Sequence, residues 1–252
     1  MTHNSIYLFD IDGTLTKPRT VIEPYMKNFL INLNKHVKIG LVGGSDLVKI
    51  SEQLACSSEE LKVMFDYTFT ENGLVSFKKT ETGYIELSNA NIHEHLGEDL
   101  LQKVINFCLS YIASLKLPAK RGTFIEYRRG MLNVCPVGRS CSQSERDEFA
   151  EFDKINGIRS KMVELLKNEF SNDNLCFSIG GQISIDIFPI GWDKTFSLQF
   201  LKNDGFRHIF FFGDKTSPGG NDYEIFSHSL TKGFTVTSPE DTKAKLEELL
   251  SL

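Results

Sequence analysis

The chain has 252 residues, 40% of them hydrophobic and 24% charged, which is enough apolar sequence for one large or two modest domains. A net charge of −5 argues against the broad basic surface of a nucleic-acid-binding protein, and no apolar run approaches the ~20 residues of a membrane span. The five cysteines form no Cys-x-x-Cys pair, and the first residues show no basic-then-apolar signal, so we expect reduced thiols in a cytoplasmic protein.

The first expected strand, residues 6–9, is apolar and is followed by Asp10 and Asp12. Side chains two residues apart on a strand point the same way, so both carboxylates should project from the carboxyl edge of the sheet, where open α/β sheets place their sites. Two carboxylates this close need a cation, a shared proton or strong hydrogen bonds. We interpret the pair as a site that holds Mg²⁺ and presents a carboxylate to a phosphoryl group. The alternative is an ordinary Asp-Gly turn at a strand end.

Strands and helices alternate towards both ends of the chain. Apolar residues at helical spacing over 26–33 precede a strand at 38–42, a second helical pattern covers 47–54, and another apolar strand lies at 207–212. This alternation predicts an α/β fold whose core is a doubly wound, parallel, Rossmann-like sheet.

The middle of the chain instead combines short strands, paired as hairpins, with long helical segments. The hairpins are expected at 123–134 and 175–187, and the helical segments at 97–116 and 145–170. Such a pattern predicts a compact α+β module with an antiparallel sheet. We therefore expect a catalytic core over residues 1–86 and 189–252, with a cap domain inserted at 87–188.

Two further segments are suited to binding phosphate. Gly43–Asp46 lies between a strand and a helix, where glycine amides such as that of Gly44, the Ser45 hydroxyl and the helix N-terminus can hold an anion. A simple helix N-cap is the equal alternative. Lys194 opens another expected helix, where its charge opposes the helix dipole and gains from a nearby anion.

The strand at 207–212 repeats the opening pattern, because it also ends in a carboxylate, Asp214. We predict that Asp214 completes the Mg²⁺ site, since hard cations prefer oxygen ligands. Asn221 and Asp222 follow a Pro-Gly-Gly turn and are expected to hydrogen-bond or to join the outer shell of the metal.

These parts together suit phosphoryl transfer. The metal and Lys194 would neutralise charge on the transferring group. Asp10, which is nearer the strand, is the predicted nucleophile and would form an aspartyl phosphate. Asp12 is the predicted general acid and base.

The middle segment carries arginines that could bind a second anion: Arg121, Arg128, Arg129, Arg139 and Arg146. Guanidinium groups suit phosphate because they donate two parallel hydrogen bonds. Arg146 lies in the first turn of an expected helix, where a cation is unfavourable unless an anion compensates. We assign Arg121 and Arg129 to solvated surface. Ser184 and Asp186 alternate with isoleucines and so face away from the apolar side of their strand.

Six strings of this chain resemble one family closely. They are Phe-Asp-Ile-Asp-Gly-Thr-Leu-Thr at 9–16, Val-Gly-Gly-Ser-Asp at 42–46, Gly-Arg-Ser-Cys at 138–141, Gly-Gly-Gln-Ile-Ser-Ile-Asp at 180–186, Gly-Trp-Asp-Lys at 191–194 and Gly-Asp-Lys-Thr-Ser-Pro-Gly-Gly-Asn-Asp at 213–222. The core strings are similar to those of the haloacid dehalogenase superfamily. The full set, which spans nearly the whole chain, resembles the eukaryotic phosphomannomutase family.

The resemblance implies an activity and a set of partners. The family interconverts mannose 6-phosphate and mannose 1-phosphate through an aspartyl phosphate and a hexose 1,6-bisphosphate, which also serves as activator, and so supplies GDP-mannose synthesis. It implies Mg²⁺, a homodimer formed through the cap, and no nucleic-acid or membrane partner. The residues that the resemblance implies to contact the phosphosugar are Arg19, Arg128, Arg139, Arg146, Ser184 and Asp186.

The resemblance also implies a second cation near residues 226–231, and here the chain departs from the family. Phe226, through its carbonyl, and Thr231 match the pattern, but His228 stands where an Asp is usual. A neutral imidazole is a poorer ligand for a hard cation, so we expect a weaker or differently filled site.

Two other functions stay open at this stage. A sugar-phosphate phosphatase would use the same core residues and differ only in letting water reach the phosphoaspartate. A receiver-like signalling module also carries acidic residues at the edge of a parallel sheet, but the Asp-x-Asp-Gly-Thr order and the large insertion argue against it.

Overall fold

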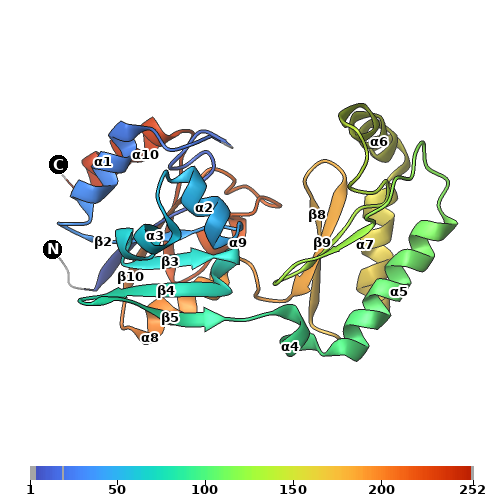
Figure 1. Ribbon diagram of the computed structural model, residues 1–252, viewed down its shortest axis with the longest axis horizontal. Helices are drawn as coiled ribbons and strands as arrows, with labels where there is room; N and C mark the ends of the chain where they lie inside the picture. The colour runs from blue at the N-terminus through green and yellow to red at the C-terminus, as the bar shows by residue number, and fades with distance from the viewer. Residues whose placement is uncertain (1–3, 19, 251–252) are drawn as a thin grey trace. The chain divides into compact units, whose positions relative to one another are not determined.

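The computed structural model describes residues 4–18 and 20–250, and the chain divides into two compact units. Met1–Asn89 and Gly191–Leu252 form the core unit, and Ala90–Ile190 form the inserted unit. The division falls a few residues beyond each boundary expected from the sequence. Each unit has its own sheet (Figure 1).

The core unit is built on a seven-stranded sheet with the order β11-β10-β1-β2-β3-β4-β5. Its strands are β1 (Ser5–Phe9), β2 (Lys38–Val42), β3 (Tyr67–Thr70), β4 (Val75–Thr80), β5 (Gly83–Asn89), β10 (His208–Gly213) and β11 (Thr231–Thr235). All neighbours from β11 to β3 pair in parallel, whereas β4 and β5 extend the sheet antiparallel. The carboxyl ends of β1, β2 and β10 therefore meet at one edge of the sheet.

Helices cover both faces of this sheet (Figure 1). They are α1 (Pro24–Leu33), α2 (Leu47–Gln53), α3 (Ser58–Met64), α8 (Leu198–Asn203), α9 (Tyr223–Ser227) and α10 (Pro239–Leu250), with short 3-10 helices η1 (Glu71–Gly73) and η2 (Lys194–Ser197). Tyr7 and Phe9 pack with α1, α2, α3 and α10, whereas Ile6 and Leu8 pack with α8 and α9. Successive β1 residues thus enter opposite cores, as the strand period requires. The predicted doubly wound α/β fold is confirmed.

The inserted unit contains a four-stranded antiparallel sheet with the order β6-β7-β9-β8. Its strands are β6 (Ile125–Tyr127), β7 (Leu132–Val134), β8 (Leu175–Gly180) and β9 (Ser184–Pro189). Both predicted hairpins are present. One face of the sheet is apolar: Leu132 and Ile187 are buried, and the Phe170 ring, which follows the last helix, contacts Phe107 and Phe177.

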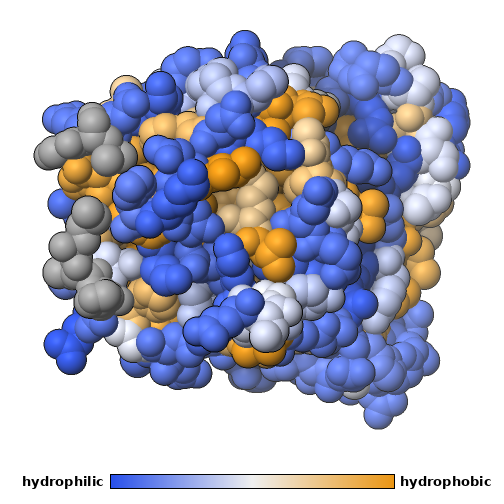
Figure 2. Space-filling model, turned by 60° about the vertical axis from the view of Figure 1, so that its left-hand side comes forward, coloured by the Kyte–Doolittle hydropathy of each residue, from blue (hydrophilic) through white to orange (hydrophobic). Residues whose placement is uncertain are grey.

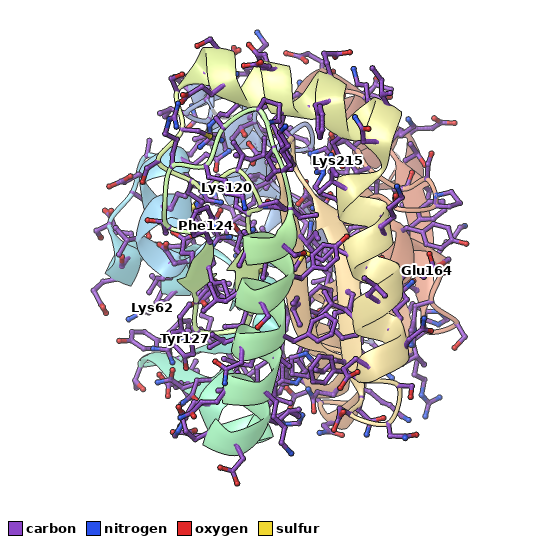
Figure 3. The ribbon with its side chains drawn as sticks, turned by 90° about the vertical axis from the view of Figure 1, so that its right-hand side faces the viewer. Lys62, Lys120, Phe124, Tyr127, Glu164 and Lys215 are labelled. Carbon is purple, nitrogen blue, oxygen red and sulfur yellow. The ribbon has the colours of Figure 1, made fainter. Side chains whose placement is uncertain are left out.

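The helices of this unit are α4 (Ile92–Leu96), α5 (Glu98–Ser114), α6 (Gln143–Asn156) and α7 (Ile158–Glu169). Figure 3 looks onto their side of the unit, where α5 and α7 run side by side and Tyr127 marks the end of β6. The single helix expected over 145–170 is wrong. Gly157 adopts a left-handed conformation with φ 63°, which ends α6 and lets α7 start in a new direction.

The surface seen in Figure 2 is mostly hydrophilic, and its hydrophobic side chains lie in small scattered groups. Among the described residues, no helix has the length and apolar content to cross a membrane.

Candidate active site

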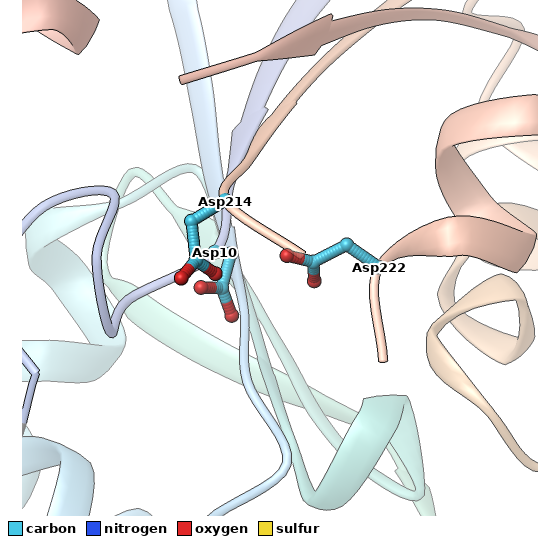
Figure 4. A group of neighbouring side chains, drawn as sticks. All are labelled: Asp10, Asp214 and Asp222. Carbon is cyan, nitrogen blue, oxygen red and sulfur yellow. The ribbon is translucent and has the colours of Figure 1, made fainter. Parts of the chain in front are cut away.

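The candidate site lies where β1 and β10, which are neighbours in the sheet, both end. Phe9 pairs with Phe212, and the backbone N–H of Asp10 donates to the Phe212 carbonyl at 3.0 Å, so the two strands stay in register up to the first carboxylate. Asp10 and Asp214 then leave their strands at the same edge. Figure 4 shows their carboxylates close together, with that of Asp222 beside them.

Asp10, Asp214 and Asp222 form a group of three carboxylates whose candidate ligand oxygens all lie within 4.8 Å of one another. Asp10 and Asp222 are buried, and Asp214 is half-buried. The Asp222 carboxylate is oriented by the backbone N–H of Lys215, which it accepts at 3.1 Å. From the sequence, Asp222 was expected in the outer shell of the metal and not among its ligands; the Asn-Asp end of the Pro-Gly-Gly turn is its only signal.

Lys194 neutralises part of this charge from the first position of η2. Its side chain is 1% exposed, and its ammonium group contacts both Asp10 and Asp222, the latter at 2.5 Å. Asp193 holds the start of η2 by accepting the Thr195 N–H at 2.8 Å, and the Ser197 hydroxyl donates to the Lys194 carbonyl. Lys194 is therefore fixed in the site and is not a solvated lysine.

Three carboxylates against one ammonium group leave two negative charges in excess at this site. Burial raises the pKa of the Asp10 carboxyl, an effect that Lys194 opposes and Asp222 reinforces, and burial likewise raises the pKa of Asp214. Burial alone would lower the pKa of Lys194, but Asp10 and Asp222 outweigh it and raise that pKa. Closely spaced oxygen ligands with this excess of negative charge fit a hard divalent cation such as Mg²⁺.

Gly13 lets the loop after β1 approach Asp214. It has φ +77°, and a Cβ built on it would lie 2.5 Å from an Asp214 carboxylate oxygen. An alanine there would be strained and would push against this carboxylate. The same loop places the Thr14 hydroxyl 3.5 Å from Asp10.

Asp12 points its carboxylate to a different neighbour. The Gln53 amide at the end of α2 donates to Asp12 Oδ1 at 2.8 Å and to the Thr16 hydroxyl at 2.8 Å. The Asp12 carboxylate is not in the group of three, although the sequence predicts it as a metal ligand. A cavity of about 380 Å³ lies beside it, lined by Asp12, Thr20, Val21, Lys49, Glu52 and Gln53.

The segment Gly43–Asp46 follows β2, the other neighbour of β1. Asp46, and not Ser45, caps α2, because its carboxylate accepts the Lys49 N–H at 2.9 Å. Gly44 is exposed and Ser45 half-buried in the turn before this cap. Both lie at the carboxyl edge of the sheet.

The candidate second-cation residues lie around the turn from α9 to β11: Phe226 is in α9, His228 is in the loop, and Thr231 begins β11. The Thr231 hydroxyl is directed at backbone carbonyls, those of Ile225 at 2.5 Å and His228 at 3.0 Å. His228 Nδ1 accepts the Leu230 N–H at 3.1 Å. Neither Phe226 nor Thr231 contributes to the group of three carboxylates.

Three of the candidate phosphosugar residues of the inserted unit, Arg139, Arg146 and Asp186, are linked by hydrogen bonds. Arg139 donates to Asn133 Oδ1 at 2.6 Å, and Asn133 donates to Asp186 Oδ1 at 2.6 Å. Arg146 reaches the Arg139 carbonyl at 3.2 Å. Ser184 shares the face of Asp186 but is buried, and its hydroxyl donates to the Gly180 carbonyl.

Four other arginines were candidates from the sequence, and one of them, Arg129, is exposed. Arg128 pairs with Glu126. Arg121 is exposed and pairs with Glu145. Arg19 lies outside the described residues. Glu126 and Asn133 were not singled out from the sequence, although both alternate with apolar strand residues.

Comparison with known proteins places this chain in a family. Residues 26–252 match the family model of eukaryotic phosphomannomutase. A protein of Oryza sativa subsp. indica named phosphomannomutase is 55% identical over 242 residues, which cover 96% of this chain and 94% of that protein. The chain belongs to the eukaryotic phosphomannomutase family.

Other relatives agree with this placement. A Caenorhabditis elegans protein named probable phosphomannomutase is 53% identical over 247 residues, or 98% of this chain and 95% of that one. The structure of Aspergillus fumigatus trehalose-6-phosphate phosphatase has a TM-score of 0.61 at 13% identity, covering 99% of this chain and 93% of that chain. That likeness shows the fold alone. The recognition of the phosphomannomutase family from motifs is confirmed, and the chain is an enzyme with the haloacid dehalogenase fold.

Replacing Lys194 with Met keeps the length of the side chain but removes the ammonium group between two buried carboxylates. We expect the free energy of unfolding to fall by about 3–5 kcal/mol at neutral pH without divalent cations, because the variant leaves buried charge unpaired. Urea denaturation followed by circular dichroism measures the change.

Lys202→Met is the matched control, since Lys202 is exposed on α8. We expect it to change the free energy of unfolding by no more than about 0.5 kcal/mol. Equal effects of the two substitutions would contradict a structural role for the Lys194 ion pairs.

Proposed function

We propose that this chain is a phosphomannomutase that interconverts mannose 6-phosphate and mannose 1-phosphate through a hexose 1,6-bisphosphate. The observation that carries the proposal is the buried Asp10 carboxylate, held by the Lys194 ammonium at the carboxyl edge of the sheet. A carboxylate in this position is a suitable acceptor for a phosphoryl group. The choice of mannose phosphate as the substrate rests on membership of the phosphomannomutase family.

In the proposed reaction, a carboxylate oxygen of Asp10 attacks phosphorus of the bisphosphate and forms an aspartyl phosphate. The bond between phosphorus and the sugar oxygen breaks, and Asp12 gives this oxygen a proton. In the return step, Asp12 takes the proton from the sugar hydroxyl that attacks the aspartyl phosphate. The Gln53 hydrogen bond orients Asp12 for this exchange.

The chain's own residues also bind and neutralise the reacting phosphate. We assign this to Lys194 and to the turn of Gly44 and Ser45. Mg²⁺ bound by Asp10 and Asp214, with Asp12 and Asp222 nearby, would withdraw charge from the phosphoryl oxygens. A second cation at the Phe226 carbonyl and Thr231 stays part of the proposal, weakened by His228.

We assign the other phosphate and the sugar to the inserted unit and the chemistry to the core unit. The residues proposed to bind the phosphosugar are Arg19, Arg128, Arg139, Arg146, Ser184 and Asp186. We further propose that hexose 1,6-bisphosphate is the activator, that the chain is a cytoplasmic homodimer formed through the inserted unit, and that its product enters GDP-mannose synthesis. Hexose phosphates are its proposed partners, with no nucleic-acid or membrane partner.

A coupled assay tests the reaction directly. Mannose 1-phosphate is supplied with a catalytic amount of hexose bisphosphate, and mannose 6-phosphate and free phosphate are followed together. A phosphomannomutase yields the 6-phosphate with little free phosphate, whereas the alternative, a sugar-phosphate phosphatase, releases phosphate in step with substrate loss. Glucose 1-phosphate in a parallel assay measures the sugar preference.

Asp10→Asn tests the nucleophile, because it keeps the shape of the side chain but removes the anionic oxygen. We expect mutase activity to fall by about a thousandfold or more, in line with the loss of other covalent nucleophiles. Circular dichroism should show an unchanged fold. Substantial activity in a folded Asp10→Asn variant would overturn the assignment.

Arg146→Ala tests phosphosugar binding by the inserted unit. We expect affinity for mannose 6-phosphate, measured by titration calorimetry, to fall by about tenfold to a hundredfold, since a charged hydrogen bond contributes about 1.5–3 kcal/mol. Mg²⁺ binding should not change, because the carboxylate group lies in the core unit. Arg121→Ala, which removes an arginine already paired with Glu145, is the control and should bind as the unaltered chain does.

A further inference from the structure

One row of polar side chains crosses the sheet of the inserted unit. Glu126 pairs with Asn133, and Asn133 pairs with Asp186, on three neighbouring strands. Directly opposed residues of an antiparallel sheet project from the same face. Their strand neighbours Val134 and Ile185 are fully buried and project from the opposite, apolar face.

Two arginines converge on Glu126 in this row. Arg128 donates from Nε at 2.8 Å and from Nη2 at 2.5 Å to Oε2 of Glu126. Arg139 Nε lies 3.2 Å from the same oxygen. A single carboxylate oxygen thus holds both guanidinium groups, and Arg139 extends the network through Asn133 to Asp186.

The carboxylate holds together two charges that would otherwise repel each other. Guanidinium groups that share an acceptor are like charges a few ångströms apart, and without Glu126 the two long side chains would separate and regain rotamer freedom. The three side chains are 30–40% exposed, so solvent screens these ion pairs and they can exchange partners.

Glu126 also occupies the part of Arg128 that a phosphate would use. The Nε and Nη2 groups form one edge of the guanidinium fork, which binds carboxylate and phosphate with the same geometry. A phosphate bound by Arg128 through this edge must therefore displace the carboxylate or share it.

We propose that Glu126 is a positioning residue: its carboxylate is a resident anion that keeps Arg128 and Arg139 gathered and that competes with the phosphate they bind. This inference rests on the proposed function, in which these arginines take a phosphate of the sugar. That reaction requires the bisphosphate to present each phosphate in turn, so the arginines must release a phosphate as readily as they bind it. The Glu126 carboxylate lowers the affinity of the two arginines for phosphate and pairs with them again after the phosphate leaves.

Glu126→Gln tests this inference, because the amide keeps the shape and an acceptor oxygen but removes the charge. We expect inorganic phosphate and mannose 6-phosphate to bind the full-length variant about three- to tenfold more tightly, the effect of one charge some 7 Å away in a water-like medium. Titration calorimetry without divalent cations measures the affinity. In the Arg128→Ala background, the same substitution should have a clearly smaller effect.

Two control variants separate competition from other causes. Glu126→Asp keeps the charge and should bind phosphate no more tightly than the unaltered chain. Glu151→Gln removes a carboxylate that pairs with Lys154 on the exposed side of α6, and it should leave the affinity unchanged. A gain in affinity in either control would overturn the proposal.

Unchanged or weaker phosphate binding by Glu126→Gln would also overturn the proposal. A variant that fails to fold would do the same, since a half-exposed carboxylate that acts by competition should not be needed for folding. The measurement does not use turnover. A chain that binds phosphate more tightly after Glu126→Gln but has no mutase activity would therefore reject the proposed function and retain this inference.

Discussion

The buried contact of Lys194 with Asp10 and Asp222 is the interaction on which the rest of the candidate site depends. It joins the end of β1, the start of η2 and the residue before α9, three segments far apart in the sequence. Without the ammonium group, three carboxylates could not stay charged at one sheet edge. With it, two negative charges remain, which one divalent cation would balance.

The cationic side chains of the two units are held in physically different ways. In the core unit, the ammonium of Lys194 is buried and fixed by η2, so its charge is present before any substrate arrives and costs no reorganisation. In the inserted unit, the arginines are partly exposed and already paired with a carboxylate. The first arrangement suits bond making and breaking at one phosphorus atom. The second suits repeated binding and release of phosphate.

The sequence was sufficient for the fold class and for the strands that end in Asp10 and Asp214, because apolar runs that stop at carboxylates are a strong local pattern. It was insufficient where tertiary contacts decide. Gly157 splits a helical pattern that is continuous in hydrophobic spacing. Asp222 joins the carboxylate group only because the turn after β10 folds back on Lys215. Glu126 could not be recognised from the sequence, because its ion pairs are with Arg128 and Arg139, which lie further along the chain.

In the proposed reaction, Asp10 carries the phosphoryl group between the two ends of the sugar. The most direct test of this role is to load the chain with labelled hexose 1,6-bisphosphate, locate the label by peptide mass spectrometry, and then add mannose 1-phosphate. We expect the label on Asp10 and its transfer to the sugar, which becomes a bisphosphate. Label on another residue, or its release only as inorganic phosphate, would rule out this role of Asp10.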